Sequence, residues 1–133
     1  MAAFAGARFE MTTPDNITDL KPNEVFVFGS NLGGFHDGGA ARVAMKKFGA
    51  VYGLGEGLVC QSYAFPTLDT ELQQYSTETL AKFAQTFIKT AEALPAVTFY
   101  LTKVGCGIAG YTEYYMKQFF VNTPPNVVKP RGW

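Results

Sequence analysis

Apolar segments of strand length alternate along this chain with amphipathic segments, and this alternation limits the possible folds more than any other feature of the sequence. Residues 25–28 are a run of β-branched and aromatic side chains, typical of a strand covered on both faces. Residues 58–65 and 97–104 have the same character, and Pro66 is expected to end the first of these two segments. Helices are predicted over residues 40–48, 76–94 and 111–121.

This order of elements favours an α/β fold with a mainly parallel central sheet. Short additional strands are expected over residues 8–13 and 126–128. Right-handed crossovers bring the carboxyl ends of the three main strands to one edge of the sheet, where ligands bind in open α/β folds. The loops that follow these strands are therefore where a ligand site is expected.

Composition restricts the class of protein. The chain has 133 residues, of which 47% are hydrophobic and 17% charged, so it can bury one core and is too apolar for disorder. We predict a single domain over residues 1–133. The formal net charge is zero, which removes the attraction that draws basic proteins to phosphate backbones or anionic lipids. Neither a membrane nor non-specific nucleic acid is expected as a partner.

Two cysteines, Cys60 and Cys106, are too few for a disulfide framework. The first residues lack the basic and apolar regions of a signal peptide. Together these features predict a reducing, cytoplasmic location with both thiols free.

A glycine-rich loop over residues 29–39 joins the first strand to the first helix. Glycine lets backbone N–H groups approach a ligand without a Cβ in the way, and the helix start adds unpaired donors, so phosphate is a natural ligand. The alternative, a flexible loop with a glycine-packed helix start, is equally open from loop chemistry alone. The spacing matches neither the ATPase nor the dinucleotide motif. The candidate ligand-binding residues here are Gly29, Ser30, Asn31, Gly33, Gly34, Phe35, Gly38 and Gly39.

A second glycine-rich loop, residues 105–111, lies between the third strand and the last helix. Two such loops at neighbouring strand ends would aim their donors at one diphosphate, with Tyr111 or Phe35 stacking on a ribose or base. Further candidates for ligand binding, in this loop and at the end of the middle strand, are Pro66, Thr67, Gly105, Cys106, Gly107, Ile108, Ala109, Gly110 and Tyr111.

Three side chains are candidates for chemistry. His36 and Asp37 are candidate general bases, although a loop pair of this kind is more often solvated or caps the helix that follows. Cys106 is a candidate nucleophile, but such a cysteine needs a partner base and His36 is the chain's only histidine, so a packing thiol is the more common outcome. One histidine and two separated cysteines do not form a zinc set. No metal and no cofactor is expected.

Three blocks of sequence together resemble macro-domain-like proteins. They are residues 25–49, which include the first glycine loop, the segment 62–67, and the second glycine loop at 105–110. The likeness is to uncharacterised bacterial and phage members and to the branch that contains terminal ADP-ribose glycohydrolases. It covers most of the chain from Glu24 to Phe120.

The resemblance implies a three-layer α/β/α macro-like domain with a mixed, mainly parallel central sheet. Its ligand would be ADP-ribose or a related nucleotide diphosphate, either free or on an ADP-ribosylated macromolecule. Residues 29–31 would enter the cleft, residues 36–39 would lie near the distal ribose, and residues 105–111 would wrap the diphosphate. Asp15 would correspond to an acidic residue near adenine, with a register that is off by one residue.

Two departures from the family leave catalysis open. In the glycohydrolase branch a lysine follows the middle strand and an acidic residue follows the second loop, whereas this chain has Leu68 and Ala109 nearest those positions. If the chain hydrolyses an ADP-ribosyl linkage, Asp37 or His36 would assist. The alternatives are a non-catalytic interaction or structural module that keeps the fold without the ligand, and a hydrolase that depends on Cys106. A cleft filled by Phe35 or Tyr111 would favour the module, and an open groove lined by N–H groups would favour binding.

Overall fold

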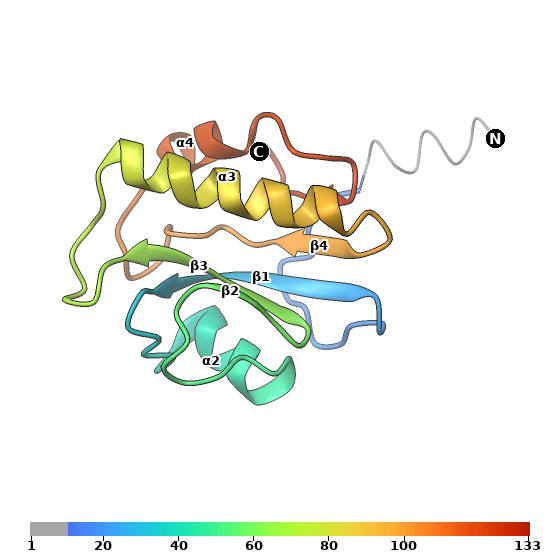
Figure 1. The fold of residues 1–133 in the computed structure, drawn as a ribbon, viewed down its shortest axis with the longest axis horizontal. Coiled ribbons are helices and arrows are strands. Elements are labelled where there is room, and N and C mark those ends of the chain that lie inside the picture. The colour runs from blue at the N-terminus through green and yellow to red at the C-terminus, as the bar shows by residue number, and fades with distance from the viewer. Residues whose placement is uncertain (1–10) are drawn as a thin grey trace.

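The computed structural model describes residues 11–133 as an α/β fold around a mixed five-stranded sheet with strand order β2-β3-β1-β4-β5 (Figure 1). Residues 8–10 of the strand expected over residues 8–13 lie outside the described residues, and residues 11–13 form no strand. The elements, in chain order, are β1 (Glu24–Asn31), α2 (Gly39–Lys47), β2 (Gly57–Val59), β3 (Ser62–Leu68), α3 (Thr77–Ala93), β4 (Thr98–Leu101), α4 (Glu113–Met116), the 3-10 helix η1 (Lys117–Phe120) and β5 (Val127–Val128).

The central strand of the sheet is β1, the most apolar run of the sequence. It pairs in parallel with β3 on one side and with β4 on the other. Strand β5 continues the sheet in parallel beyond β4, and β2 alone among the described strands runs antiparallel, beside β3. The prediction of a mainly parallel sheet is therefore confirmed.

Side chains of β1 alternate between two apolar clusters on opposite faces of the sheet. Val25 and Val27 pack into the larger cluster, which includes Phe87 of α3, whereas Phe26 and Phe28 pack with α2. Figure 1 shows α3 and α4 on one side of the sheet and α2 on the other. The centroid of the Phe87 ring lies 5.0 Å from that of Tyr63 and 5.8 Å from that of Phe99, so Phe87 joins α3 to two strands.

The segment expected as one strand over residues 58–65 is a hairpin, so that expectation is wrong. Strand β2 turns at Cys60, whose φ is 53°, and β3 returns antiparallel to it. Pro66 does not end β3 but lies inside it, paired with Ser30. Pairing with β2 reaches only as far as Ala64, so no strand of the described residues lies beside Pro66 on that side to need its missing N–H.

The last strands and helices are shorter than predicted. The strand expected over residues 97–104 ends at Leu101, and the helix expected over 111–121 is split into α4 and η1. Tyr111 belongs to the preceding loop, which its N–H closes by donating to Gly105 O at 2.9 Å. The helix begins instead after Thr112, whose hydroxyl accepts from Tyr115 N at 3.1 Å.

The remaining helices and the short β5 follow the sequence closely. Helices α2 and α3 match the predicted segments within a residue or two, and Ser76 caps α3 by accepting from Thr79 N at 3.2 Å. Among the helices of residues 11–133, none combines the length and the apolarity needed to cross a bilayer.

Candidate functional site

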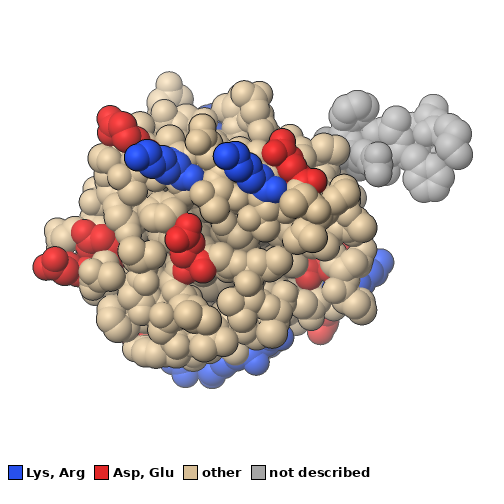
Figure 2. Space-filling model, in the orientation of Figure 1, with Lys and Arg blue, Asp and Glu red and all other residues tan. Residues whose placement is uncertain are grey.

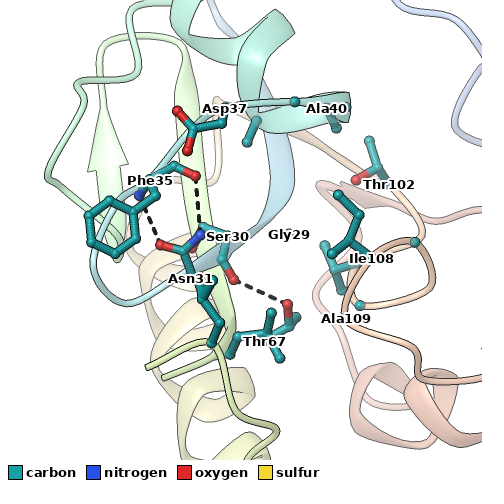
Figure 3. A pocket seen from close by; sticks show the side chains of 18 of the residues that line it. Gly29, Ser30, Asn31, Phe35, Asp37, Ala40, Thr67, Thr102, Ile108 and Ala109 are labelled. Carbon is teal, nitrogen blue, oxygen red and sulfur yellow. Dashed lines mark hydrogen bonds between the residues drawn. The ribbon is translucent and has the colours of Figure 1, made fainter. Parts of the chain in front are cut away.

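A cavity of about 790 Å³ opens at the carboxyl ends of β1, β3 and β4. The start of α2 and residues 29–39 form one side of it, and residues 102–109 form the other (Figure 3). Its volume falls within the range of about 300–1,000 Å³ that is usual for small-molecule sites. Twelve of the predicted site residues line it, namely Gly29, Ser30, Asn31, Phe35, Asp37, Gly38, Gly39, Thr67, Gly105, Gly107, Ile108 and Ala109.

The two glycine loops touch each other at the base of the cavity. A Cβ added to Gly29 would lie 3.1 Å from Gly105 N and 3.4 Å from Val104 Cα. Gly105 has φ +80°, a conformation that favours glycine. A side chain on Gly29 would therefore push the loops apart, which is why the bases of both can lie this close together.

Several backbone N–H groups of the lining have no acceptor within the described part of the chain. On α2 these are the donors of Gly39, Ala40 and Ala41, and Gly38 supplies no side-chain cap. In the second loop they are the donors of Gly105, Gly107, Ile108 and Ala109. An anion in the cavity would find these donors unpaired.

Most polar side chains at this edge of the sheet already bond to the backbone. Asn31 is the clearest case, because its Oδ1 accepts from Phe35 N at 2.8 Å and its Nδ2 donates to Phe35 O at 3.1 Å (Figure 3). Three hydroxyls, those of Ser30, Thr67 and Thr102, likewise donate to the main-chain carbonyls of Gly55, Ser30 and Val27. These side chains shape the cavity, but their donors are already used. The backbone N–H groups are therefore the donors that remain for a ligand.

His36 is not among the residues that line the cavity, although Asp37 beside it is. The imidazole is 1% exposed and packs edge-on against Phe28, with the ring centroids 5.3 Å apart. Its Nε2 lies 3.1 Å from Leu54 O, so this nitrogen carries the proton and donates it. Its Nδ1 has no hydrogen-bond partner among the described residues. His36 thus joins the first loop to residues 51–55 rather than facing a substrate.

Asp37 is the one carboxylate that the described residues contribute to the lining, and Figure 3 shows it beside the start of α2. Loss of contact with water and then the charge and hydrogen bond of Asp37 raise the pKa of the Tyr52 phenol.

Cys106 and Tyr111 also lie outside the lining. Burial raises the pKa of the Cys106 thiol, which packs against the α3-side cluster, whereas His36 packs on the other face of the sheet. The structure therefore does not bring a cysteine and histidine pair together. The Tyr111 ring stacks on Tyr115 with an interplanar angle of 6°, so that stacking face is already occupied. The other predicted residues outside the lining are Asp15, Gly33, Gly34, Pro66 and Gly110.

Sequence reasoning missed three parts of the cavity wall. The first is Ala40 and Ala41 at the start of α2. The second is residues 102–104, whose Lys103 is, with Asp37, the charged part of the lining among the described residues. The signal of Lys103 was its position, two residues before the second glycine loop begins. The third is residues 72–74, where Gln74 Nε2 donates to Ala109 O at 2.7 Å and so joins this segment to the second loop. Within residues 11–133 no group of three or more histidine, cysteine or acidic side chains is placed to hold a metal ion.

Comparison of the chain with protein-family models, with curated proteins and with solved structures gave no match in any of the three.

Proposed function

We propose that this cavity binds ADP-ribose or a related nucleotide diphosphate. The observation that carries the proposal is the contact between Gly29 and Gly105, with unpaired donors on the loop of each. Two sets of N–H groups that meet around one hollow favour a ligand with two linked phosphates over a single small anion. The resemblance to macro-domain-like proteins supports the same ligand, either free or attached to a macromolecule.

The arrangement of the helices supports a three-layer α/β/α, macro-like domain, since α2 lies on one face of the sheet and α3 on the other (Figure 1). The cavity supports a binding protein over a module without a ligand. Tyr111 does not line the cavity, because its hydroxyl is held by Thr67 O and Tyr75 N. The Phe35 ring is 42% exposed at the edge and leaves about 790 Å³ open.

We propose binding as the primary activity. Leu68 and Ala109, which replace the lysine and the acidic residue of the glycohydrolase branch, both line the cavity and offer no proton-transfer group. If an ADP-ribosyl linkage is hydrolysed, Asp37 is the residue placed to orient water. The two free thiols fit the proposed reducing, cytoplasmic compartment.

Isothermal titration calorimetry with ADP-ribose, AMP and NAD tests the proposal. Gly107 lines the cavity, and a Cβ added to it would have nothing within 4 Å, so a side chain fits there without strain. Gly107→Asp should weaken ADP-ribose binding by about tenfold or more, because a carboxylate would face the diphosphate. Gly107→Asn is the matched control and should bind nearly as the wild type does. No heat and no thermal shift with millimolar ADP-ribose would overturn the proposal.

A further inference from the structure

Lys103 is the basic side chain among the described residues that line the cavity. It follows the carboxyl end of β4, two residues before Gly105, where the two glycine loops touch. Its ammonium does not lie free, because Nζ is 3.3 Å from Glu113 Oε2. Lys103 lines the cavity while Glu113 does not, and the two side chains are 50% and 48% exposed, so the ion pair lies at a solvent-exposed edge of the lining.

Glu113 has a second partner of its own. Its Oε1 accepts from Trp133 Nε1 at 3.2 Å, and the indole packs against Phe120 with the ring centroids 5.8 Å apart. This carboxylate is therefore held in place by a donor other than Lys103. Lys103 can leave it without leaving the carboxylate unpaired.

A cation would strengthen the binding of a diphosphate, and the rest of the cavity does not supply one. The hydroxyls and the amide of Ser30, Asn31, Thr67 and Thr102 are used by the backbone. The unpaired N–H groups contribute only partial charges, and the other charged side chain of the lining, Asp37, repels phosphate.

We propose that Lys103 is the phosphate-binding cation of this cavity and that Glu113 holds it at this exposed edge until an anion replaces the carboxylate. This inference rests on the proposed function and names the side chain that discriminates in favour of phosphate. The exchange costs little, because an ion pair this exposed contributes little free energy. A phosphate oxygen of the bound ligand then accepts a charge-assisted hydrogen bond from the lysine.

Calorimetry with ADP-ribose and with inorganic pyrophosphate on four variants tests this role. Lys103→Met should weaken ADP-ribose binding about tenfold, whereas Lys103→Arg should keep most of the affinity. Glu113→Gln should strengthen binding by about threefold, since the competing carboxylate is gone. That gain should vanish in the double variant that also carries Lys103→Met, which a purely structural role for Glu113 does not predict.

Lys89→Met is the matched control. Lys89 is exposed in the second half of α3, and its replacement by Met changes the net charge by the same amount as Lys103→Met does. If Lys103→Met binds ADP-ribose like this control, the role of Lys103 is overturned while the proposed function stands. Lys103-dependent binding of pyrophosphate without binding of ADP-ribose supports the cation and overturns the nucleotide function. Absence of binding to both probes overturns both.

Discussion

The two glycine loops of the cavity are both bonded internally but differ in how closely other backbone packs on their glycines. In the first, Gly34 N donates to Asn31 O and Gly53 N donates to Gly34 O, each at 2.9 Å, and a Cβ on Gly34 would meet the backbone of Gly53. In the second, Tyr111 N donates to Gly105 O and Gly110 N donates to Gly107 O, but Gly107 has nothing within 4 Å of an added Cβ. The Ile108 side chain in this loop is 94% exposed.

This contrast shows that glycine serves two purposes in one site. In the first loop Gly34 allows the backbone of Gly53 to pass closely. In the second loop Gly107 leaves open space beside the uncovered N–H groups of residues 107–109. Basic side chains also gather along the edge formed by α2, as Figure 2 shows, and this helix carries Arg42, Lys46 and Lys47.

The largest expected effect comes from Gly34→Ala in the first loop. Gly34 has φ +73°, and a Cβ there would lie 2.4 Å from the carbonyl carbon of Gly53. Backbone strain and this clash should lower the free energy of unfolding by about 3 kcal/mol or more. Urea denaturation followed by circular dichroism would measure the loss.

Gly107→Ala in the second loop is the control for that change. Its Cβ would enter open space, so the free energy of unfolding should change by no more than about 0.5 kcal/mol. Equal losses in the two variants would contradict the contrast between a crowded glycine at position 34 and an open one at position 107.

The sequence predicted the framework of this cavity because hydrophobic pattern decides which strands are central. The buried run of β1 and the amphipathic face of α3 were visible as patterns, and both form where expected. The hairpin at Cys60 was not visible, because a non-glycine residue at φ 53° carries no turn signature. The prediction that Pro66 ends the strand was wrong for a related reason, because proline ends a strand only where a neighbouring strand needs its N–H.

An intermediate effect is expected for Tyr111→Phe, which releases the end of the second loop. The Tyr111 hydroxyl accepts from Tyr75 N and donates to Thr67 O, each at 2.9 Å. Its loss leaves two backbone groups unpaired and should lower the free energy of unfolding by about 1–2 kcal/mol. Thermal denaturation would measure the change. Tyr114→Phe is the control, because Tyr114 is 83% exposed, and a loss as large there would refute the anchoring role.

Side-chain roles in the site could not be read from the sequence, because they depend on which partner each group meets. Asn31 and Ser30 have the chemistry of ligand contacts but use it on the backbone of residues 35 and 55. His36 lies next to Asp37 in the chain, yet His36 is buried behind the cavity wall while Asp37 lines it. Only tertiary packing separates these neighbours.

The smallest expected effect concerns the end of the second loop, where hydrogen bonds from Trp133 and then Lys103 lower the pKa of the Glu113 carboxyl. Because the folded pKa is below the unfolded one, the stability from this carboxylate is present above the usual value of 4.5 and lost as pH falls through the folded value. Trp133→Phe keeps a ring on Phe120 but removes the donor, so the Glu113 pKa should rise toward 4.5. A carbon-detected NMR titration would measure it, and Lys103→Met should give a smaller rise. An unchanged titration in both variants would show that Glu113 is not held between the two partners.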